Sequence, residues 1–222
     1  MSRTMTPSQL KNKIQNIVDA LVNKKIAMLR TRVEIRQAKS ALRVSWARAA
    51  GAPVLNDHPF ASMSEYRSIL EHQDFSALLA DGAVLQMSYD IEGNRVCGHR
   101  LVYYPCPYIL NRAELAEFPI VEVLELAERS PDSRRLRGPI RFDYSTKEDA
   151  SISPAHVHLS DAECRCPMVA PLMPGQFLRF VFASFYPDQW KSGGYLRELP
   201  RGLLDRSIQG EHMFDLHFGC SR

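Results

Sequence analysis

Residues 139–166 read PIRFDYSTKEDASISPAHVHLSDAECRC, and this stretch indicates a sheet with polar side chains on one surface. The segments around Arg141 and His156 alternate polar and apolar residues, as half-buried strands do. Side chains two residues apart on a strand point the same way, so Arg141 shares a face with Asp143, and His156 shares one with His158. If these strands are neighbours, one surface holds an arginine, a carboxylate and two imidazoles. Such a surface suits an anionic ligand or a metal.

Alternation and turn signals elsewhere predict an α+β fold with a mainly antiparallel sheet and packed helices. Glu92-Gly93-Asn94 is a hairpin signal between two expected strands, 83–90 and 95–104. Further strands are expected at 138–144, 155–160, 164–170 and 211–219; one or two short helices are expected at 63–80, and further helices at 112–128 and 175–186.

The N-terminal segment predicts a long helical extension. Thr6-Pro7-Ser8 is a helix start, and no Gly or Pro follows before Gly51. Apolar residues from Leu10 to Leu42 fall on a three-to-four spacing, which is typical of an amphipathic helix. A break near Asn23-Lys24-Lys25 is an alternative. The sequence therefore divides into a helical arm, residues 1–52, and an α+β domain, residues 53–222.

Charge is unevenly distributed along the chain. Residues 1–50 hold eleven Lys and Arg against two acids, a net +9, while the rest of the chain carries −6. A basic arm can bind nucleic acid by neutralising phosphates, dock on a larger acidic protein, or pack on its own domain with a solvated face. It could also self-associate through its apolar seam. The residues expected to bind nucleic acid or a partner are Lys11, Lys13, Lys24, Lys25, Arg30, Arg32, Arg36, Lys39, Arg43 and Arg48.

Bulk composition is that of a globular protein of 222 residues, with 45% apolar and 24% charged residues. No run of about 18 apolar residues predicts a transmembrane helix, and no signal-peptide core is present near the N-terminus. Five cysteines without a disulfide-like framework fit a reducing compartment. These features predict a cytoplasmic protein without membrane contact.

Four sequence pieces from about Tyr66 onward resemble an uncharacterised bacterial family of domain-of-unknown-function proteins. They are residues 81–89 (DGAVLQMSY), 101–107 (LVYYPCP), 141–144 (RFDY) with His156, and 164–167 (CRCP) followed by a Phe-rich helix that closes in Phe185-Tyr186. The resemblance implies a small cytoplasmic protein from a mobile or defence-associated gene neighbourhood, without an established activity. The Arg-x-Asp and His-x-His pairing is also similar to small toxins of toxin–antitoxin pairs.

The residues support two classes of function, and the sequence does not decide whether there is catalysis. In the first, the protein is a binding component of a prokaryotic, defence-like, multi-protein system, and its basic arm engages nucleic acid or a larger effector. In the second, it is a metal-dependent or His-based phosphodiester hydrolase. A histidine would move a proton, an arginine would hold a phosphate, and the carboxylate would orient the histidine or bind a metal. The candidate catalytic residues are Arg141, Asp143, His156, His158, Arg165 and Tyr186, with Tyr144 as an alternative to the last.

These residues can also have purely structural roles, because an arginine and an aspartate on a strand often form an ion pair, and a half-buried histidine often only forms hydrogen bonds within the protein. A zinc site of His156, His158, Cys164 and Cys166 is a further alternative. Gly-rich phosphate loops and the His-Glu-x-x-His and Gly-x-Ser-x-Gly motifs are absent, which disfavours kinases, P-loop ATPases, zincins and α/β-hydrolases. The sequence assigns no cofactor.

Overall fold

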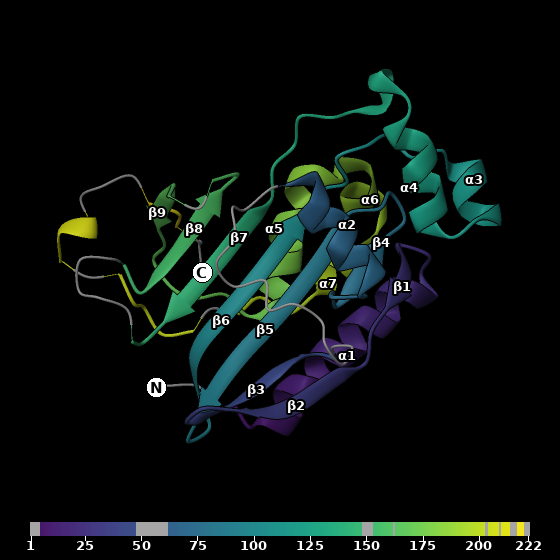
Figure 1. Ribbon diagram of the computed structural model, residues 1–222. Coiled ribbons are helices and arrows are strands. Elements are labelled where there is room, and N and C mark those ends of the chain that lie inside the picture. Colours follow the sequence, from purple (N-terminus) through teal and green to yellow (C-terminus); the bar gives the residue numbers. More distant parts are fainter. Residues whose placement is uncertain are drawn as a thin grey trace.

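The described strands form one antiparallel sheet with helices packed on it (Figure 1). The computed structural model describes residues 5–47, 62–147, 153–161, 163–202, 204–208, 210–213 and 217–219. In sheet order the strands are β1 (Ala27–Arg30), β4 (Ala77–Leu79), β5 (Val84–Glu92), β6 (Arg95–Tyr104), β7 (Ile140–Ser145), β8 (Ala155–Leu159) and β9 (Arg165–Pro167). A branch adds β3 (Ala41–Trp46), which pairs with β5, and β2 (Val33–Ala38), which pairs with β3. The predicted α+β class is confirmed.

The hairpin of β5 and β6 lies at the centre of the sheet, as predicted from its turn. Gly93 and Asn94 form a two-residue loop and both have positive φ, 54° and 64°. A tight hairpin turn of this kind needs that backbone, and Gly and Asn adopt it most readily. The strands expected at 138–144, 155–160 and 164–170 are also present as β7, β8 and β9, each antiparallel to the one before it.

The N-terminal helix is much shorter than predicted. Helix α1 (Pro7–Asn23) begins with a capping box, in which Thr6 and Gln9 each bond the backbone N–H of the other. It ends where Lys25 adopts a left-handed φ of 57° and Ile26 N–H bonds Leu21 O. The break that was the alternative prediction is therefore real. The prediction of a helix continuing to Ala50 is wrong.

Residues 27–46 form three strands in place of that helix. Val33, Ile35, Val44 and Trp46 are β-branched or aromatic and alternate with polar residues, which favours a strand. In the β2–β3 turn, Lys39 adopts the left-handed φ of 51° that Gly or Asn usually takes. Because no Gly stands there, the sequence gives no sign of this turn. Pairing of β3 with β5 then buries Val44 against the central hairpin, so a nonlocal contact decides the structure of this segment.

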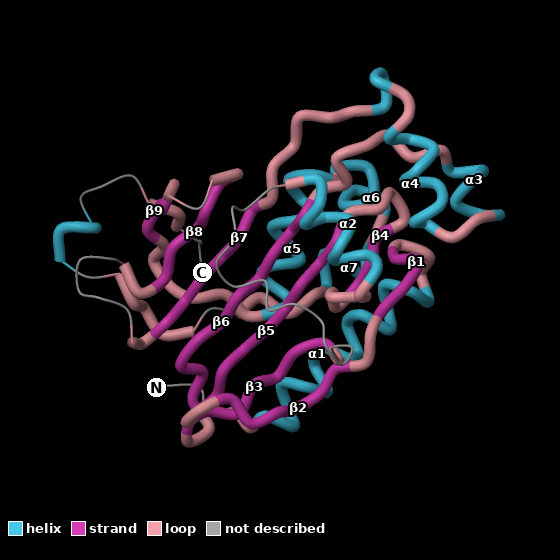
Figure 2. Tube along the Cα trace, viewed as in Figure 1, coloured by secondary structure: helices cyan, strands magenta, loops and turns pink. Residues whose placement is uncertain are grey.

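Two apolar clusters lie on opposite faces of the sheet. The larger one joins the sheet to α1 and to α5 (Pro174–Phe185), and Figure 2 shows the strands in front of these two helices. The smaller one covers the other face only near one end, where Val84, Val102 and Tyr104 pack against α2 (Met63–Glu71) and α4 (Ile120–Glu128). The rest of this second face bears polar side chains.

The remaining elements complete the described chain. They are α3 (Arg112–Glu117), α6 (Pro187–Ser192), α7 (Gly194–Glu198) and the short 3-10 helices Pro131–Ser133 and Gly210–Met213. Three predictions are corrected here. The helical segment expected at 63–80 ends at Glu71 and is followed by β4; the helix expected at 112–128 is interrupted at Pro119, which cannot donate a helical hydrogen bond. Of the strand expected at 211–219, the structure describes residues 211–213, which belong to a 3-10 helix, and residues 217–219, in which Phe218 forms a bridge to Met168.

The arm predicted for residues 1–52 shares its core with the rest of the chain. Leu10, Ile14 and Leu21 of α1 are fully buried in the same cluster as Phe177 of α5. The apolar seam that was expected to allow self-association is thus covered by the chain's own sheet and helices. The predicted boundary at residue 52 lies outside the described residues.

Candidate functional site

The polar side chains of the quoted motifs lie on the face of the sheet opposite the large core. The strand register aligns Arg100, Asp143 and His156 in one row across β6, β7 and β8. It aligns Arg141 and His158 in the next row, which Arg165 of β9 completes. Directly paired residues of antiparallel strands share a face, so these two rows are adjacent on one surface. The structure thus brings together Arg141, Asp143, His156, His158 and Arg165, all five predicted from the strands.

Asp143 is the centre of this surface. Its Oδ1 lies 3.2 Å from Arg100 Nε, and its Oδ2 lies 2.7 Å from Arg141 Nε and 3.5 Å from His158 Nε2. Burial alone would raise the pKa of Asp143, but the positive charges of Arg100 and Arg141 outweigh it and lower that pKa. Asp143 is therefore a carboxylate that holds two guanidinium groups in fixed positions.

The two imidazoles pack against each other beside Asp143. Their ring centroids are 4.9 Å apart, and the exposed fractions of His156 and His158 are 4% and 1%. His156 Nδ1 lies 3.0 Å from Ser153 O, and a carbonyl only accepts, so Nδ1 carries a proton and Nε2 is the ring atom that would bear the lone pair of a neutral imidazole. One ligand atom from each of Asp143, His156 and His158 lies within 4.8 Å of the others.

Arginines of the predicted arm lie on the same face of the sheet. The register pairs Arg36 of β2 with Arg43 of β3, and Arg43 with Asp90 of β5. Asp90 holds Arg43 by two hydrogen bonds, from Nε at 2.7 Å and Nη2 at 2.8 Å, and Arg36 Nη2 donates to Ser45 Oγ at 2.8 Å. The polar sheet face, as we call it, thus carries Arg36, Arg43, Asp90, Arg100, Arg141, Asp143, His156, His158 and Arg165.

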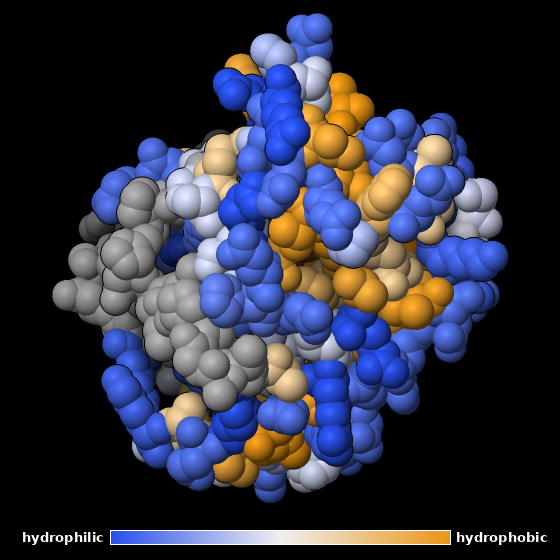
Figure 3. All heavy atoms as spheres, turned by 45° about the vertical axis from the view of Figure 1, so that its right-hand side comes forward, coloured by the Kyte–Doolittle hydropathy of each residue, from blue (hydrophilic) through white to orange (hydrophobic). Residues whose placement is uncertain are grey.

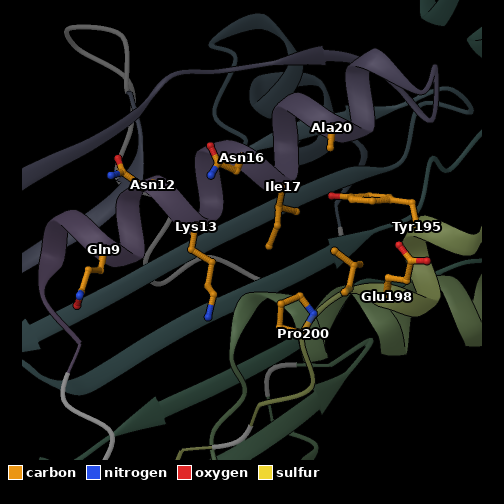
Figure 4. Close-up of a pocket in the computed structure, with 10 residues that line it drawn as sticks. Gln9, Asn12, Lys13, Asn16, Ile17, Ala20, Tyr195, Glu198 and Pro200 are labelled. Atoms are coloured by element: carbon orange, nitrogen blue, oxygen red, sulfur yellow. The ribbon is translucent and has the colours of Figure 1, made fainter.

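Other residues of the predicted basic helix are dispersed. Lys11 and Lys13 lie on α1, and Figure 4 shows Lys13 beside a groove of about 620 Å³ between α1 and α7. Lys24 lies over the ring of Tyr195, and Arg30 forms an ion pair with Asp19. Lys25, Arg32 and Lys39 are exposed outside helices and strands, and Arg48 lies outside the described residues. The basic residues therefore form no single helical face.

The candidate tyrosines lie on the opposite side of the sheet. Tyr186 O–H donates to Asp81 Oδ2 at 3.0 Å, and Tyr103 O–H donates to Tyr186 at 3.3 Å. Burial, followed by the negative charge of Asp81, raises the pKa of Tyr186. Tyr144 packs against the ring of His99 on the core side. The structure thus does not bring Tyr186 or Tyr144 to His156 and His158.

The zinc site with two cysteines does not form in this register. Cys166 pairs directly with Val157, whose side chain points into the large core, whereas Arg165 pairs with His158. Cys166 therefore lies on the other face of the sheet from both histidines. Sequence alternation could not show this, because the register between β8 and β9 is set only by their pairing.

Arg100 belongs to the site, but the sequence did not predict its position beside Asp143. It stands in a predicted strand, and its alternation with Leu101 was visible, but its position beside Asp143 depends on β6 and β7 being neighbours. Its side chain is 36% exposed, against 16% for Arg141, so Arg100 lies nearer to solvent.

Comparison with models of protein families assigns the chain to a family. A family model described as an uncharacterised conserved protein, DUF2290, matches residues 27–220. The chain belongs to this family. The expected resemblance to an uncharacterised family is thereby confirmed, and the match begins at the first residue of β1, so it includes the three strands that the sequence had assigned to the arm. Curated proteins and solved structures give no match.

The helices were also compared with the length and hydropathy of membrane spans. Among the helices described, none combines the length and the apolar character that crossing a bilayer requires.

Proposed function

We propose that this protein binds the phosphate backbone of a nucleic acid on its polar sheet face, as a cytoplasmic component of a prokaryotic, defence-like, multi-protein system. The observation that carries the proposal is the register that gathers five arginines from β2, β3, β6, β7 and β9 on one surface. Arginine suits this task because its planar fork of donors matches phosphate oxygens. The family and its implied gene neighbourhood are compatible with such a role.

The aspartates of this face support the proposal by orienting the arginines. Asp90 fixes Arg43 through two contacts, and Asp143 fixes Arg100 and Arg141 through their Nε atoms. A guanidinium held by Nε keeps donors on its Nη atoms for another anion. Arg36, which is partly exposed, and Arg165, which is exposed, lie on strands at opposite ends of the polar sheet face and would extend the contact over several phosphates.

The salt dependence of binding tests this proposal. We expect the variant Arg36→Gln/Arg165→Gln to weaken binding of a labelled single-stranded or duplex oligonucleotide and to lower the slope of log K against log salt by about 2, one unit for each lost phosphate contact. The measurement is fluorescence anisotropy at several salt concentrations.

The matched control is Lys11→Gln/Lys13→Gln, which removes the same charge from α1, on the other side of the sheet. This variant should keep the wild-type slope. If only the lysine variant loses affinity, the interface lies on the helix and the proposal is wrong. The proposal is also wrong if the wild-type protein binds neither the single-stranded nor the duplex oligonucleotide at low salt.

Phosphodiester hydrolysis is a second candidate function, and the proximity of Asp143, His156 and His158 favours it. The neutral ring of His156 would have a lone pair on Nε2 to accept a proton, and Arg141, which contacts Asp143 and pairs with His158 in the register, would hold the phosphate. Cleavage of an oligonucleotide that stops in His156→Ala while binding persists would support hydrolysis. Intact substrate after long incubation with wild-type protein and divalent metals would argue for binding alone.

A further inference from the structure

We propose that Asp143, His156 and His158 bind a divalent transition-metal ion of the class of Zn²⁺, Co²⁺ or Fe²⁺. The three side chains offer one carboxylate oxygen and two imidazole nitrogens within 4.8 Å of one another. All three are buried, at 9% exposure for Asp143 and less for the histidines. Two histidines and one carboxylate form a common ligand set for such ions. The site lies on the polar sheet face, but binding of a metal to it does not require binding of nucleic acid.

The backbone of two adjacent strands fixes these ligands. Asp143 of β7 pairs directly with His156 of β8, and His158 lies two residues further along the same strand. Paired and alternate strand positions of one face lie close enough for their side chains to converge. Little rearrangement is therefore needed for the three groups to bind one ion.

Hydrogen bonds around the site orient the ligands as they do in metalloproteins. The Nδ1–H of His156 donates to Ser153 O at 3.0 Å, which leaves Nε2 as the ligand atom. Asp143 Oδ1 accepts a hydrogen bond from Arg100 Nε at 3.2 Å, and its Oδ2 forms an ion pair with Arg141 Nε at 2.7 Å. Metal-binding histidines usually donate their second ring N–H to a carbonyl or carboxylate, and metal-binding carboxylates are themselves hydrogen-bonded.

The neighbouring charges select the class of metal. Mg²⁺ and Ca²⁺ depend on carboxylate and other oxygen ligands, and here the charge of the one carboxylate is offset by Arg100 and Arg141. Imidazole nitrogens bind Zn²⁺, Co²⁺ and Fe²⁺ well without negative charge. Three protein ligands also leave a coordination position open, and the two arginines favour an anion there, such as hydroxide or a phosphate oxygen.

Metal titration of the full-length protein tests the site. Chelator-treated wild-type protein is titrated with Co²⁺ and with Zn²⁺, followed by calorimetry and by visible absorption of the Co²⁺ form. We expect one equivalent to bind, with ligand-field bands but no thiolate charge-transfer band, and no comparable binding of Mg²⁺. His156→Gln and His158→Gln should each weaken binding at least about tenfold, whereas Cys164→Ser/Cys166→Ser should leave it unchanged.

X-ray absorption of the Zn²⁺-loaded wild-type protein decides the matter even if a histidine variant fails to fold. Nitrogen and oxygen ligands with imidazole scattering support the site. Sulfur ligands, loss of binding in the cysteine variant, unchanged affinity in folded histidine variants, or no binding to the wild-type protein overturns it.

Discussion

Replacing Asp143 with asparagine is expected to lower the free energy of unfolding by about 3–5 kcal/mol, the range measured when one member of a buried ion pair is removed. The Asp143 side chain is 12% exposed and that of Arg141 is 16% exposed, and 2.7 Å separates Oδ2 from Nε. Burial, the largest influence, lowers the pKa of Arg141, which shows how strongly this guanidinium depends on a counter-charge. Asparagine keeps the shape of the side chain but supplies no charge. Urea denaturation followed by circular dichroism measures the change.

A second Arg–Asp pair on the same face provides the matched control. Asp90 and Arg43 make an even better hydrogen-bonded pair, but their side chains are 28% and 43% exposed. Solvent screens such a pair, so Asp90→Asn should cost no more than about 1 kcal/mol. Equal and small effects of the two substitutions would show that burial does not set the strength of these pairs. The double variant Arg141→Met/Asp143→Asn should recover part of the stability, because it also removes the buried guanidinium.

The elements that the sequence predicted correctly are those with local signals. The β5–β6 hairpin has Gly93-Asn94 at a turn that needs positive φ, and the strands around Asp143 and His156 alternate with period two. Residues 27–46 contain no Gly or Pro to mark a turn, and their apolar residues also fit a helical spacing. Their alternation also favours a strand, and pairing with the distant β5, as between Val44 and Tyr89, decides between the two structures.

The same distinction holds for the candidate site. Alternation alone placed Arg141 with Asp143 and His156 with His158, because the period of a strand is local. Strand order and register were needed to add Arg100, to separate Cys166 from the histidines, and to place Tyr186 behind the sheet. Register also unites two regions that the sequence kept apart, since Arg36 and Arg43 of the supposed arm share a face with Arg141.

His99 has a structural role, unlike the candidate pair His156 and His158. From its burial we expect the folded protein to lose stability in acid. Its ring is buried on the core side of β6, where Nδ1 lies 3.2 Å from Phe142 O and Nε2 accepts the Leu172 N–H at 3.1 Å. The neutral tautomer with a proton on Nδ1 satisfies both contacts, whereas a second proton would face the Leu172 N–H. Burial is the main reason that the pKa of His99 is lowered to about 4.

This shift makes the protein less stable as the pH falls from 6.5 to 4. Above pH 6.5, the ordinary pKa of histidine, His99 is neutral in both the folded and the unfolded chain and contributes no pH dependence. Below that pH the unfolded chain binds a proton that the folded chain does not, so the free energy of unfolding decreases until the folded pKa of about 4 is reached. The difference of roughly 2.5 pKa units corresponds to a loss of about 3 kcal/mol.

Urea denaturation of the wild-type protein and of His99→Gln between pH 7.5 and about 4 measures this contribution. Glutamine has no proton to gain, so the variant should start less stable, through loss of hydrogen bonds and packing, and lose about 3 kcal/mol less than the wild type over this range. Asp143 does not account for the difference, because both proteins contain it and the stability that its lowered pKa provides is lost in both as the pH falls through the ordinary carboxyl range. Parallel stability curves for the two proteins would mean that His99 takes up its proton without unfolding. In that case the acid sensitivity would have to come from other groups.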